Sequence, residues 1–280
     1  MIVVDLSQIA ISTVTANPKF SGDIESMRYM ILNSLRNINS RFRKEYGDMI
    51  LACDNTDVWR KKIFPYYKAS RKKSRETSKL DWNMIHSNLG DILQEFRENM
   101  PYNVIKVASA EADDIIATLA KRPRNEPLLI VSGDKDFQQL QRYSNTSQWD
   151  HIGKKMIRCA DPADFLIEHI IRGDSGDGVP NVLSADDVFV VPTARQTPMN
   201  KNRYAEIYKY VSQGVMPENK QVAKFYIRNK KLIDLADIPE EIEVEVLRQL
   251  AENAVASKAK IMNYFIKNRL SKLMDNLTDF

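Results

Sequence analysis

The chain has 280 residues, enough for one large α/β domain or a main domain with a smaller one, and 43% are hydrophobic, enough to bury a core. The net charge of +4 is the small remainder of 41 basic and 37 acidic residues, so only the distribution of charge is informative. Two cysteines without metal-ligand spacing argue against a zinc site, and no apolar stretch suits a signal peptide or a membrane span. We therefore expect a soluble, cytoplasmic protein.

Short apolar runs in the first half alternate with helix-period segments, which is typical of a mostly parallel sheet with helices on its faces. Strands are predicted at residues 2–4, 49–53, 104–107 and 128–131. Three of these runs lead into acids, namely Asp5, Asp54 and the pair Asp134 and Asp136. In open α/β sheets the ligand crevice lies beyond the carboxyl ends of the strands, so we expect these acids to meet there.

The run at 104–107 feeds a predicted helix that starts near Ser109 and carries more acids in its first turns. An apolar stripe on this helix indicates the face that packs on the sheet, formed by Ala112, Ile115, Ile116, Leu119 and Ala120. Glu111 and Asp113 fall at the borders of the stripe, and Asp114 points nearly away from it. We predict Glu111 and Asp113 as site residues and give Asp114 an orienting or surface role.

Gathering so many carboxylates in one cleft is unfavourable unless cations compensate their charge. Oxygen ligands without His or Cys predict a hard ion, Mg²⁺ or Mn²⁺, and two ions about 4 Å apart suit phosphodiester hydrolysis. An EF-hand is disfavoured because no ligand Glu closes a twelve-residue loop after Asp134. An aspartate-nucleophile phosphatase is disfavoured because Ser7 stands where a second Asp is needed.

A basic segment follows Asp54, with nine basic residues and one acidic residue between 60 and 79. Aromatic residues interleave it, so it predicts a polyanion-binding stretch, although a solvated face is the alternative for any charge run. Lys68 and Arg71, one helical turn apart, are predicted to face the same phosphate. The nucleic-acid-binding residues predicted here are Arg60, Lys61, Tyr67, Lys68, Arg71, Lys72, Lys73 and Arg75.

Helical signals dominate from about residue 155. Asp161 predicts a helix start with Pro162 at its first position and Gly173 past its end, Ser184 predicts another start, and residues 173–180 (GDSGDGVP) predict a turn. An apolar helical face ends the chain, formed by Leu270, Leu273, Met274, Leu277 and Phe280. We favour a helix packed on its own domain over a docking peptide for a sliding clamp or a single-strand-binding protein.

Several motifs in this order and spacing resemble the 5′-nuclease or flap-endonuclease superfamily, and within it the ribonucleases H of T-even-type bacteriophages: VVDLSQIA, ACDNTDVWR, YYKASR, AEADDIIA, VSGDKDF, RGDSGDG and LSKLMDNLTDF. The resemblance covers essentially the whole chain. It implies a PIN-like α/β nuclease domain with two Mg²⁺ ions, in a monomer located in the host cytoplasm if the chain is viral. It also implies a helical arch or flexible bridge through which a 5′ single strand passes.

The implied activity is that of a 5′ to 3′ exonuclease and flap endonuclease on RNA·DNA and DNA duplexes, which removes lagging-strand RNA primers and 5′ flaps. The implied substrates are flap, nicked and RNA-primed duplexes. By residue, the resemblance implies a first metal cluster of Asp5, Asp54, Glu111, Asp113, Asp134 and Asp136, and a second-metal pair of Asp174 and Asp177. Lys68 and Arg71 match the arch cations, and we count them as catalytic with Asp5, Asp54 and Asp134.

The resemblance divides the chain into a nuclease domain at 1–160, with an arch at about 57–80, and a smaller helical domain at 161–280. The latter carries a helix-turn-helix-like loop that binds duplex. This loop departs from the family pattern, since Gly178 replaces Asn, Asn181 replaces Gly, and 183–185 contain no glycine. We expect weaker or differently organised duplex binding, with basic residues between 196 and 231 carrying more of it. A non-catalytic branched-DNA-binding protein is the alternative, disfavoured because none of the eight acids is missing.

Overall fold

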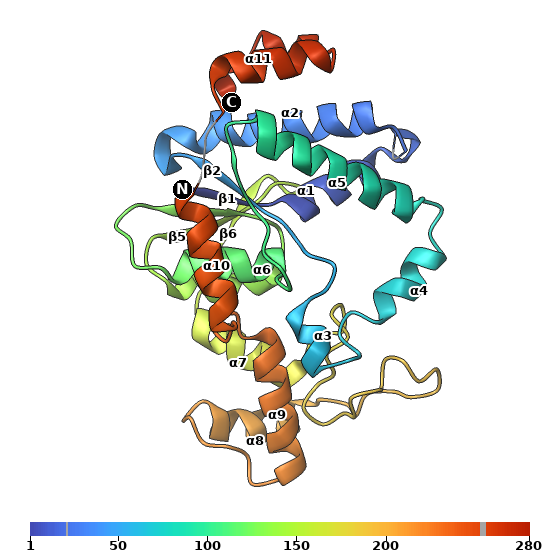
Figure 1. Cartoon of the computed structure of the whole chain (residues 1–280). Helices are drawn as coiled ribbons and strands as arrows, with labels where there is room; N and C mark the ends of the chain where they lie inside the picture. The colour runs from blue at the N-terminus through green and yellow to red at the C-terminus, as the bar shows by residue number, and fades with distance from the viewer. Residues whose placement is uncertain (21, 253–255) are drawn as a thin grey trace.

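The computed structural model describes residues 1–20, 22–252 and 256–280, without the side chains of residues 72–74. Within this part a six-stranded sheet forms in the order β3-β2-β1-β4-β5-β6 (Figure 1). Four parallel strands are those that the sequence predicts, namely β1 (Ile2–Asp5), β2 (Met49–Ala52), β3 (Asn103–Ile105) and β4 (Leu128–Val131). The prediction of a mostly parallel sheet flanked by helices is confirmed.

Two further strands were not predicted. β5 (Thr146–Asp150) pairs parallel with β4, and β6 (Lys155–Ile157) pairs antiparallel with β5 at the sheet edge. Their sequences, TSQWD and KMI, are short and carry polar residues, and β6 is largely exposed. An edge strand such as β6 needs no continuous apolar run, and β5 beside it is only partly buried, so the pattern that reveals the central strands is absent in both.

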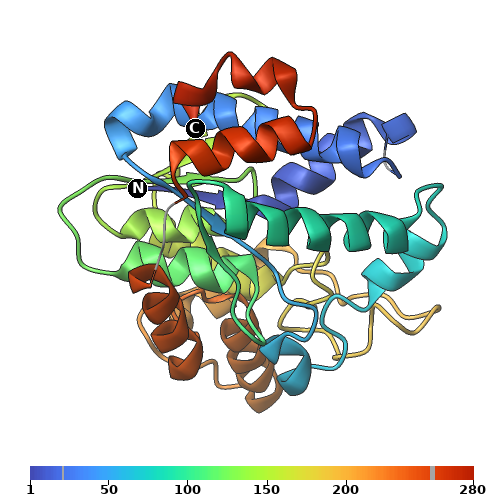
Figure 2. The ribbon, with the colours of Figure 1, turned by 45° about the horizontal axis from the view of Figure 1, so that its top comes forward.

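Helices cover both faces of the sheet (Figures 1 and 2). Alternate strand residues point to opposite sides, and the apolar residues on each side pack against a different group of helices. Val4 packs with one group of helices, α1 (Leu6–Ala16), α2 (Ile24–Tyr46), α5 (Trp82–Asn99) and α11 (Lys258–Lys267). Val3 packs with the other group, α6 (Ala112–Lys121), the 3₁₀ segment η2 (Lys135–Arg142) and α10 (Glu240–Ala251). A short 3₁₀ turn, η1 (Pro18–Phe20), follows α1.

A third hydrophobic cluster lies beside the sheet and joins the basic segment to the helical part of the chain. It contains side chains of α7 (Pro162–Arg172), α8 (Lys201–Val211) and α9 (Lys220–Ile233). The same cluster contains Val58, Phe64 and Tyr67, which flank and follow α3 (Trp59–Ile63). From there α4 (Ser70–Glu76) leads back to α5 (Figure 1). The basic segment therefore bridges two packed parts of the molecule.

The predicted limits of α7 are confirmed, but the helix predicted after Ser184 is wrong. Asp161 caps α7 by accepting from the N–H groups of Ala163 and Asp164, and Gly173 ends it with φ +70°. No helix is found between residues 173 and 200, all of which the structure describes. Ser184 Oγ instead donates to Asn181 Oδ1 at 2.9 Å and accepts from the Thr197 N–H at 2.9 Å, so it stabilises a loop.

The end of the chain packs on its own domain, as favoured from the sequence. α12 (Ser271–Met274) and η3 (Leu277–Asp279) bring Leu273 and Phe280 into the cluster that contains α2. Asn39 donates to the Asp279 carbonyl at 2.8 Å and Arg43 donates to the Phe280 carbonyl at 2.9 Å. These apolar side chains are therefore not free to act as a docking peptide. Across the described residues, no helix combines the length and apolar character that crossing a membrane requires.

Candidate metal centre and nucleic-acid cleft

Acids at the carboxyl ends of β1 and β2 are oriented by the helices that begin beside them. Asp5 ends β1 and caps α1, since its Oδ1 accepts from the Gln8 N–H at 3.0 Å. Ser132 Oγ donates to the other carboxylate oxygen of Asp5, Oδ2, at 3.3 Å. Asp54 follows β2, and its Oδ1 accepts from the N–H of Ala112, the first residue of α6, at 2.8 Å. Helix starts therefore fix the directions of both carboxylates.

Carboxylates from four separate segments of the chain lie close enough to repel one another. Burial, and then the negative charges of Asp54 and Asp134, raise the pKa of Asp5 to about 7. Burial and the charges of Asp134 and Asp5, among others, raise the pKa of Asp113 well above its usual value, although Lys68 opposes this. Repulsion of this kind makes the ionised group unfavourable unless cations neutralise it.

A second group of acids adjoins the first. Asp134 Oδ1 accepts from the Asp136 N–H at 2.9 Å, so the two acids are held at the start of η2. Burial raises the pKa of Asp136 to about 7, the charges of Asp134, Asp174 and Asp177 add to this, and His169 opposes it. The structure thus brings Asp136 beside the acids of the 174–177 turn, and Asp134 links the two groups.

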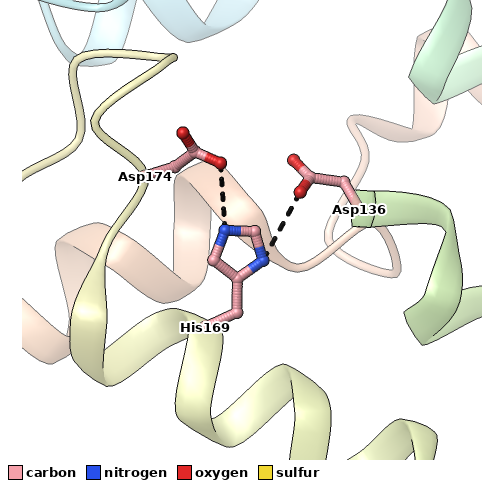
Figure 3. Close-up of side chains that lie close together, drawn as sticks. All are labelled: Asp136, His169 and Asp174. Carbon is pink, nitrogen blue, oxygen red and sulfur yellow. Dashed lines mark hydrogen bonds and ion pairs between the residues drawn. The ribbon is translucent and has the colours of Figure 1, made fainter. Parts of the chain in front are cut away.

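His169 lies inside the second group of acids (Figure 3). From the sequence, oxygen ligands alone were expected, and this histidine was not predicted as a site residue. Its Nε2 is 3.1 Å from Asp174 Oδ2, and its Nδ1 is 3.5 Å from Asp136 Oδ1. Lys135 Nζ also pairs with Asp174 Oδ2 at 2.9 Å. Although burial opposes it, hydrogen bonds from His169 and Lys135 hold the pKa of Asp174 below its usual range. A signal was available, because His169 falls in the last turn of a helix that the sequence predicts to end beside Asp174.

The predicted nucleic-acid contact of Arg60 is wrong, because its side chain is only 2% exposed. Its guanidinium pairs with Glu111 at 2.9 Å and with Asp114 at 2.8 Å, and its Nε donates to the Leu232 carbonyl at 3.0 Å. Asp114 is fully buried and also accepts from Trp59 Nε1 at 3.1 Å. Of the two roles predicted for Asp114, the surface role is wrong and the contacts are those of an orienting residue.

Tyr67 was also predicted to contact nucleic acid, and the structure contradicts this, since the residue is 3% exposed. Its hydroxyl lies 3.0 Å from Glu111 Oε2 and 2.9 Å from Asp177 Oδ2. A ring this deeply buried offers no face on which a base could stack. Tyr67 instead joins the acid that caps α6 to the turn after α7.

Lys68 and Arg71 reach the acids from the basic segment. Lys68 Nζ lies 2.5 Å from Glu111 Oε1 and 3.5 Å from Asp177 Oδ2, and Arg71 Nη2 lies 2.6 Å from Asp177 Oδ1. Although burial opposes it, the charges of Asp177 and Glu111 hold the pKa of Lys68 above its usual value. Burial of Glu111 opposes its ionisation, but the positive charges of Lys68 and Arg60 lower the pKa of Glu111 below its usual value. Both predicted arch cations therefore face the predicted metal acids.

A cavity of about 970 Å³ lies between the basic segment, α1 and α5. The acids Asp54 and Glu111 line it, together with four cations of the segment, Lys61, Lys68, Arg71 and Arg75. Lys61 and Arg75 are exposed, as a contact with nucleic acid requires. The side chains of Lys72 and Lys73, also predicted to bind nucleic acid, lie outside the described part of the structure.

The altered glycine pattern has a structural role at Gly178. This residue has φ +72°, and a Cβ there would lie 2.9 Å from the carbonyl oxygen of Tyr66. Next to it, the Asp177 carbonyl accepts from the Lys68 N–H at 2.7 Å and holds Lys68 at φ +56°. Glycine at 178 therefore lets the turn after α7 contact the backbone of the basic segment at Tyr66 directly.

The donor set fits divalent cations. Carboxylates converge from four segments, and the pKa values of Asp5 and Asp136 are raised to about 7. In the second group two buried atoms, Asp136 Oδ1 and His169 Nδ1, have no hydrogen-bond partner among the described residues. Hard cations prefer oxygen ligands of this kind, and their charge would remove the repulsion.

Comparison with known proteins agrees with this site. The family model described as 5′-3′ exonuclease, N-terminal resolvase-like domain, matches residues 8–168, and the model of the C-terminal part of T4 RNase H matches residues 162–280. Ribonuclease H of Enterobacteria phage T4 is 32% identical over 289 residues, which covers 99% of this chain and 95% of that protein. Flap endonuclease Xni of Shewanella oneidensis is 37% identical over 134 residues, covering 44% of this chain and 48% of that protein.

Solved structures share the fold. A phage T5 5′-exonuclease with bound zinc aligns with a TM-score of 0.59 at 17% identity, covering 90% of this chain and 98% of that one. A phage T5 flap endonuclease in a pseudo-enzyme–product complex with DNA and metal ions aligns with a TM-score of 0.61 at 17% identity, covering 89% and 97%. Because two family models together match residues 8–280 and a relative of 32% identity aligns along almost its whole length, the chain belongs to the 5′-3′ exonuclease family of hydrolytic nucleases.

Proposed function

We propose that this nuclease is a Mg²⁺-dependent 5′ to 3′ exonuclease and flap endonuclease that cuts RNA·DNA and DNA duplexes, removing lagging-strand RNA primers and 5′ flaps. Relatives named ribonuclease H and flap endonuclease support this, as does a related fold in complex with DNA and metal ions. The observation that carries the proposal is that Lys68 and Arg71 pair with Glu111 and Asp177, while Lys68, Arg71 and Glu111 also line one cavity.

In this proposal the acids hold two Mg²⁺ ions, for which Mn²⁺ can substitute. The acids form two sets of ligands, a larger set and a smaller set. The larger set is Asp5, Asp54, Glu111, Asp113, Asp134 and Asp136, and the smaller set is Asp174 and Asp177. When bound, the ions supply an activated water and stabilise the leaving oxygen of the phosphodiester. The helix starts that orient Asp5 and Asp54 fix the geometry of these ligands in advance.

The basic segment holds the substrate in this proposal. Lys68 and Arg71 contact the scissile phosphate, while the exposed Lys61 and Arg75 attract the backbone of the strand. The cavity between this segment and α5 gives the 5′ single strand of a flap, nicked or RNA-primed duplex a path to the acids. We expect the enzyme to act as a monomer, in the host cytoplasm if the chain is viral.

The test is cleavage of a 5′-labelled flap substrate with Mg²⁺ and with EDTA. The wild type should cut with Mg²⁺ alone, and Asp134→Asn should lose cutting but still bind the substrate, since it removes one ligand charge in the acid group. Asp275→Asn, which changes an exposed acid outside the site, is the matched control and should cut normally. If the wild type cuts in no metal and behaves like Asp134→Asn, the chain is only a branched-DNA-binding protein.

Product lengths on flap, nicked and RNA-primed duplexes test the finer part of the proposal. Short 5′ products from RNA-primed duplexes and removal of whole flaps at the junction are the expected results. Cutting that starts from the 3′ end would contradict the proposed polarity.

A further inference from the structure

The proposed mechanism does not use His169, although this residue stands between two proposed metal ligands. It is 6% exposed, with Nε2 3.1 Å from Asp174 Oδ2 and Nδ1 3.5 Å from Asp136 Oδ1 (Figure 3). The imidazole and the two carboxylates each offer one ligand atom, and these three atoms lie within 4.8 Å of one another. The nitrogen is therefore part of the same cluster as the oxygens.

The hydrogen bonding of this cluster is incomplete. Among the described residues, His169 Nδ1 and Asp136 Oδ1 are both buried and both lack a hydrogen-bond partner. A neutral imidazole has one N–H and one lone pair. When the N–H at Nε2 donates to Asp174 and Asp136 is ionised, the lone pair at Nδ1 faces a carboxylate oxygen of Asp136, so two acceptors face each other. A cation between these two atoms would accept both lone pairs.

The surrounding backbone holds the three donors in place. His169 lies in the last turn of α7, its carbonyl accepts from the Gly173 N–H at 2.8 Å, and its ring packs edge-on against Phe165 with centroids 5.7 Å apart. Gly173, at φ +70°, turns the chain back, and paired backbone hydrogen bonds between Asp174 and Val179 close the turn. Ligands on opposite sides of an ion with bonds of about 2.1 Å are about 4.2 Å apart, and the three donor atoms lie within 4.8 Å of one another.

We propose that Asp136, His169 and Asp174 form a mixed nitrogen and oxygen cation site that binds Mn²⁺ or a later first-row divalent ion in preference to Mg²⁺. Imidazole nitrogen suits these transition metals, whereas Mg²⁺ favours oxygen ligands. The inference rests on the proposed function, because it specifies the ion at the second of its two metal positions, where Asp136 and His169 join Asp174 as ligands. That position then differs in metal preference from the all-carboxylate position beside Asp5.

Lys135 competes with a cation at this site. Its Nζ lies 2.9 Å from Asp174 Oδ2 and 3.4 Å from His169 Nε2, and its side chain is 55% exposed. A cation that takes Asp174 Oδ2 as a ligand must displace this ammonium, which can move into solvent without leaving a buried charge. Removing the ammonium should therefore increase the affinity of the site.

The experiment is titration of the full chain with Mn²⁺ alone, followed by electron spin-echo measurements that detect nitrogen bound to Mn²⁺. The wild type should show coupling to an imidazole nitrogen. His169→Gln should lose that coupling and bind Mn²⁺ at one site at least about tenfold more weakly. Competition with Mg²⁺ should show a smaller change in Mg²⁺ affinity, because Mg²⁺ gains little from the nitrogen.

Two variants serve as matched controls. His151→Gln changes a histidine that bonds Ser12 Oγ at 2.9 Å and should keep the coupling and the affinity. Lys135→Met keeps His169 and should bind Mn²⁺ more tightly than the wild type. Circular-dichroism melting checks that each variant is folded, and Lys135→Met still tests the inference if His169→Gln does not fold.

The outcomes separate this inference from the proposed function. Absence of nitrogen coupling in the wild type, or its persistence in His169→Gln, overturns the mixed site even when the enzyme cuts flaps with Mg²⁺. Nitrogen coupling in a protein that cuts no substrate supports the site and overturns the proposed function. Unchanged or weaker Mn²⁺ affinity in Lys135→Met contradicts the assigned competition.

Discussion

Neighbouring cations in the basic segment have opposite environments. Arg60 is 2% exposed and pairs with two buried acids, whereas the next residue, Lys61, is exposed at the cavity. Lys68, which is partly buried, and Arg71, which is exposed, reach Glu111 and Asp177 while also lining the cavity. The same formal charge is therefore buried and paired with acids at one position and exposed at the cavity at the next.

Arg60→Met should destabilise the protein by about 3–5 kcal/mol, because it leaves the buried carboxylates of Glu111 and Asp114 without their partner. The measurement is the free energy of unfolding in urea. Lys61→Met, at the adjacent exposed position, is the control and should change it by less than about 0.5 kcal/mol. Similar small values for both variants would mean that the buried ion pairs contribute little.

Lys68→Ala should slow the chemical step more than it weakens binding. The proposed contact of Lys68 with the scissile phosphate strengthens in the transition state, so a loss of about 10²–10³ in single-turnover rate is expected. Lys61→Ala is the control, since an exposed cation near the path of the strand should weaken binding and leave the single-turnover rate unchanged. Equal losses of affinity in the two variants, with unchanged rates, would assign Lys68 to attraction of the substrate.

At the scale of elements, the turn between Asp174 and Val179 connects the basic segment to the acids. Tyr67 and the Lys68 N–H both bond Asp177, and Gly178 packs against the Tyr66 carbonyl. The turn is itself closed by paired hydrogen bonds between Asp174 and Val179. A change in this turn should therefore alter the position of Lys68 and its pairing with Glu111.

Gly178→Ala should destabilise the protein and slow cleavage, because both a left-handed backbone and a contact of 2.9 Å with the Tyr66 carbonyl exclude a Cβ. Gly214→Ala is a matched control, since Gly214 has φ +73° and nothing within 4 Å of its Cβ position. The control should show only the backbone cost of about 1 kcal/mol and normal cleavage. Equal effects of the two substitutions on cleavage would contradict the role given to the turn.

At the scale of the whole molecule, folding gathers acids that the unfolded chain keeps apart. The pKa values of Asp5 and Asp136 rise from 3.8 to about 7. The folded protein therefore keeps these protons up to about pH 7, whereas the unfolded chain releases them near pH 4. Since the folded state binds more protons in between, stability falls as pH rises from about 4 to about 7 and then levels off.

The metal-free protein should accordingly unfold at a lower temperature at pH 8 than at pH 5. Mg²⁺ should raise the melting temperature more at pH 8, when the acids are ionised and bind the cation. Melting curves with EDTA and with Mg²⁺ at both pH values measure this. Asp5→Asn keeps a good helix cap but removes one titrating group, so it should reduce the pH dependence. Metal-free stability that rises with pH would contradict the assignment.

Patterns local in the chain allowed much of the fold to be predicted from sequence. The central strands, the cap and end of α7, and the apolar stripe of α6 all depend on neighbouring residues, and the structure contains them. The helix predicted after Ser184 failed because a polar residue that caps a helix also caps a loop, and here Thr197 supplies the N–H. β5 and β6 were missed because their short, polar sequences carry no strand signal.

The sequence by itself determined the α/β class, the family resemblance and the chemical nature of the acids, because strand runs, caps and motifs are properties of adjacent residues. Only the tertiary structure decided which charges are buried together. It placed Arg60 and Tyr67 inside the protein and His169 between Asp136 and Asp174, through contacts between residues far apart in the chain. Burial and pairing depend on such distant neighbours, so no local pattern reveals whether a cation faces solvent or an acid.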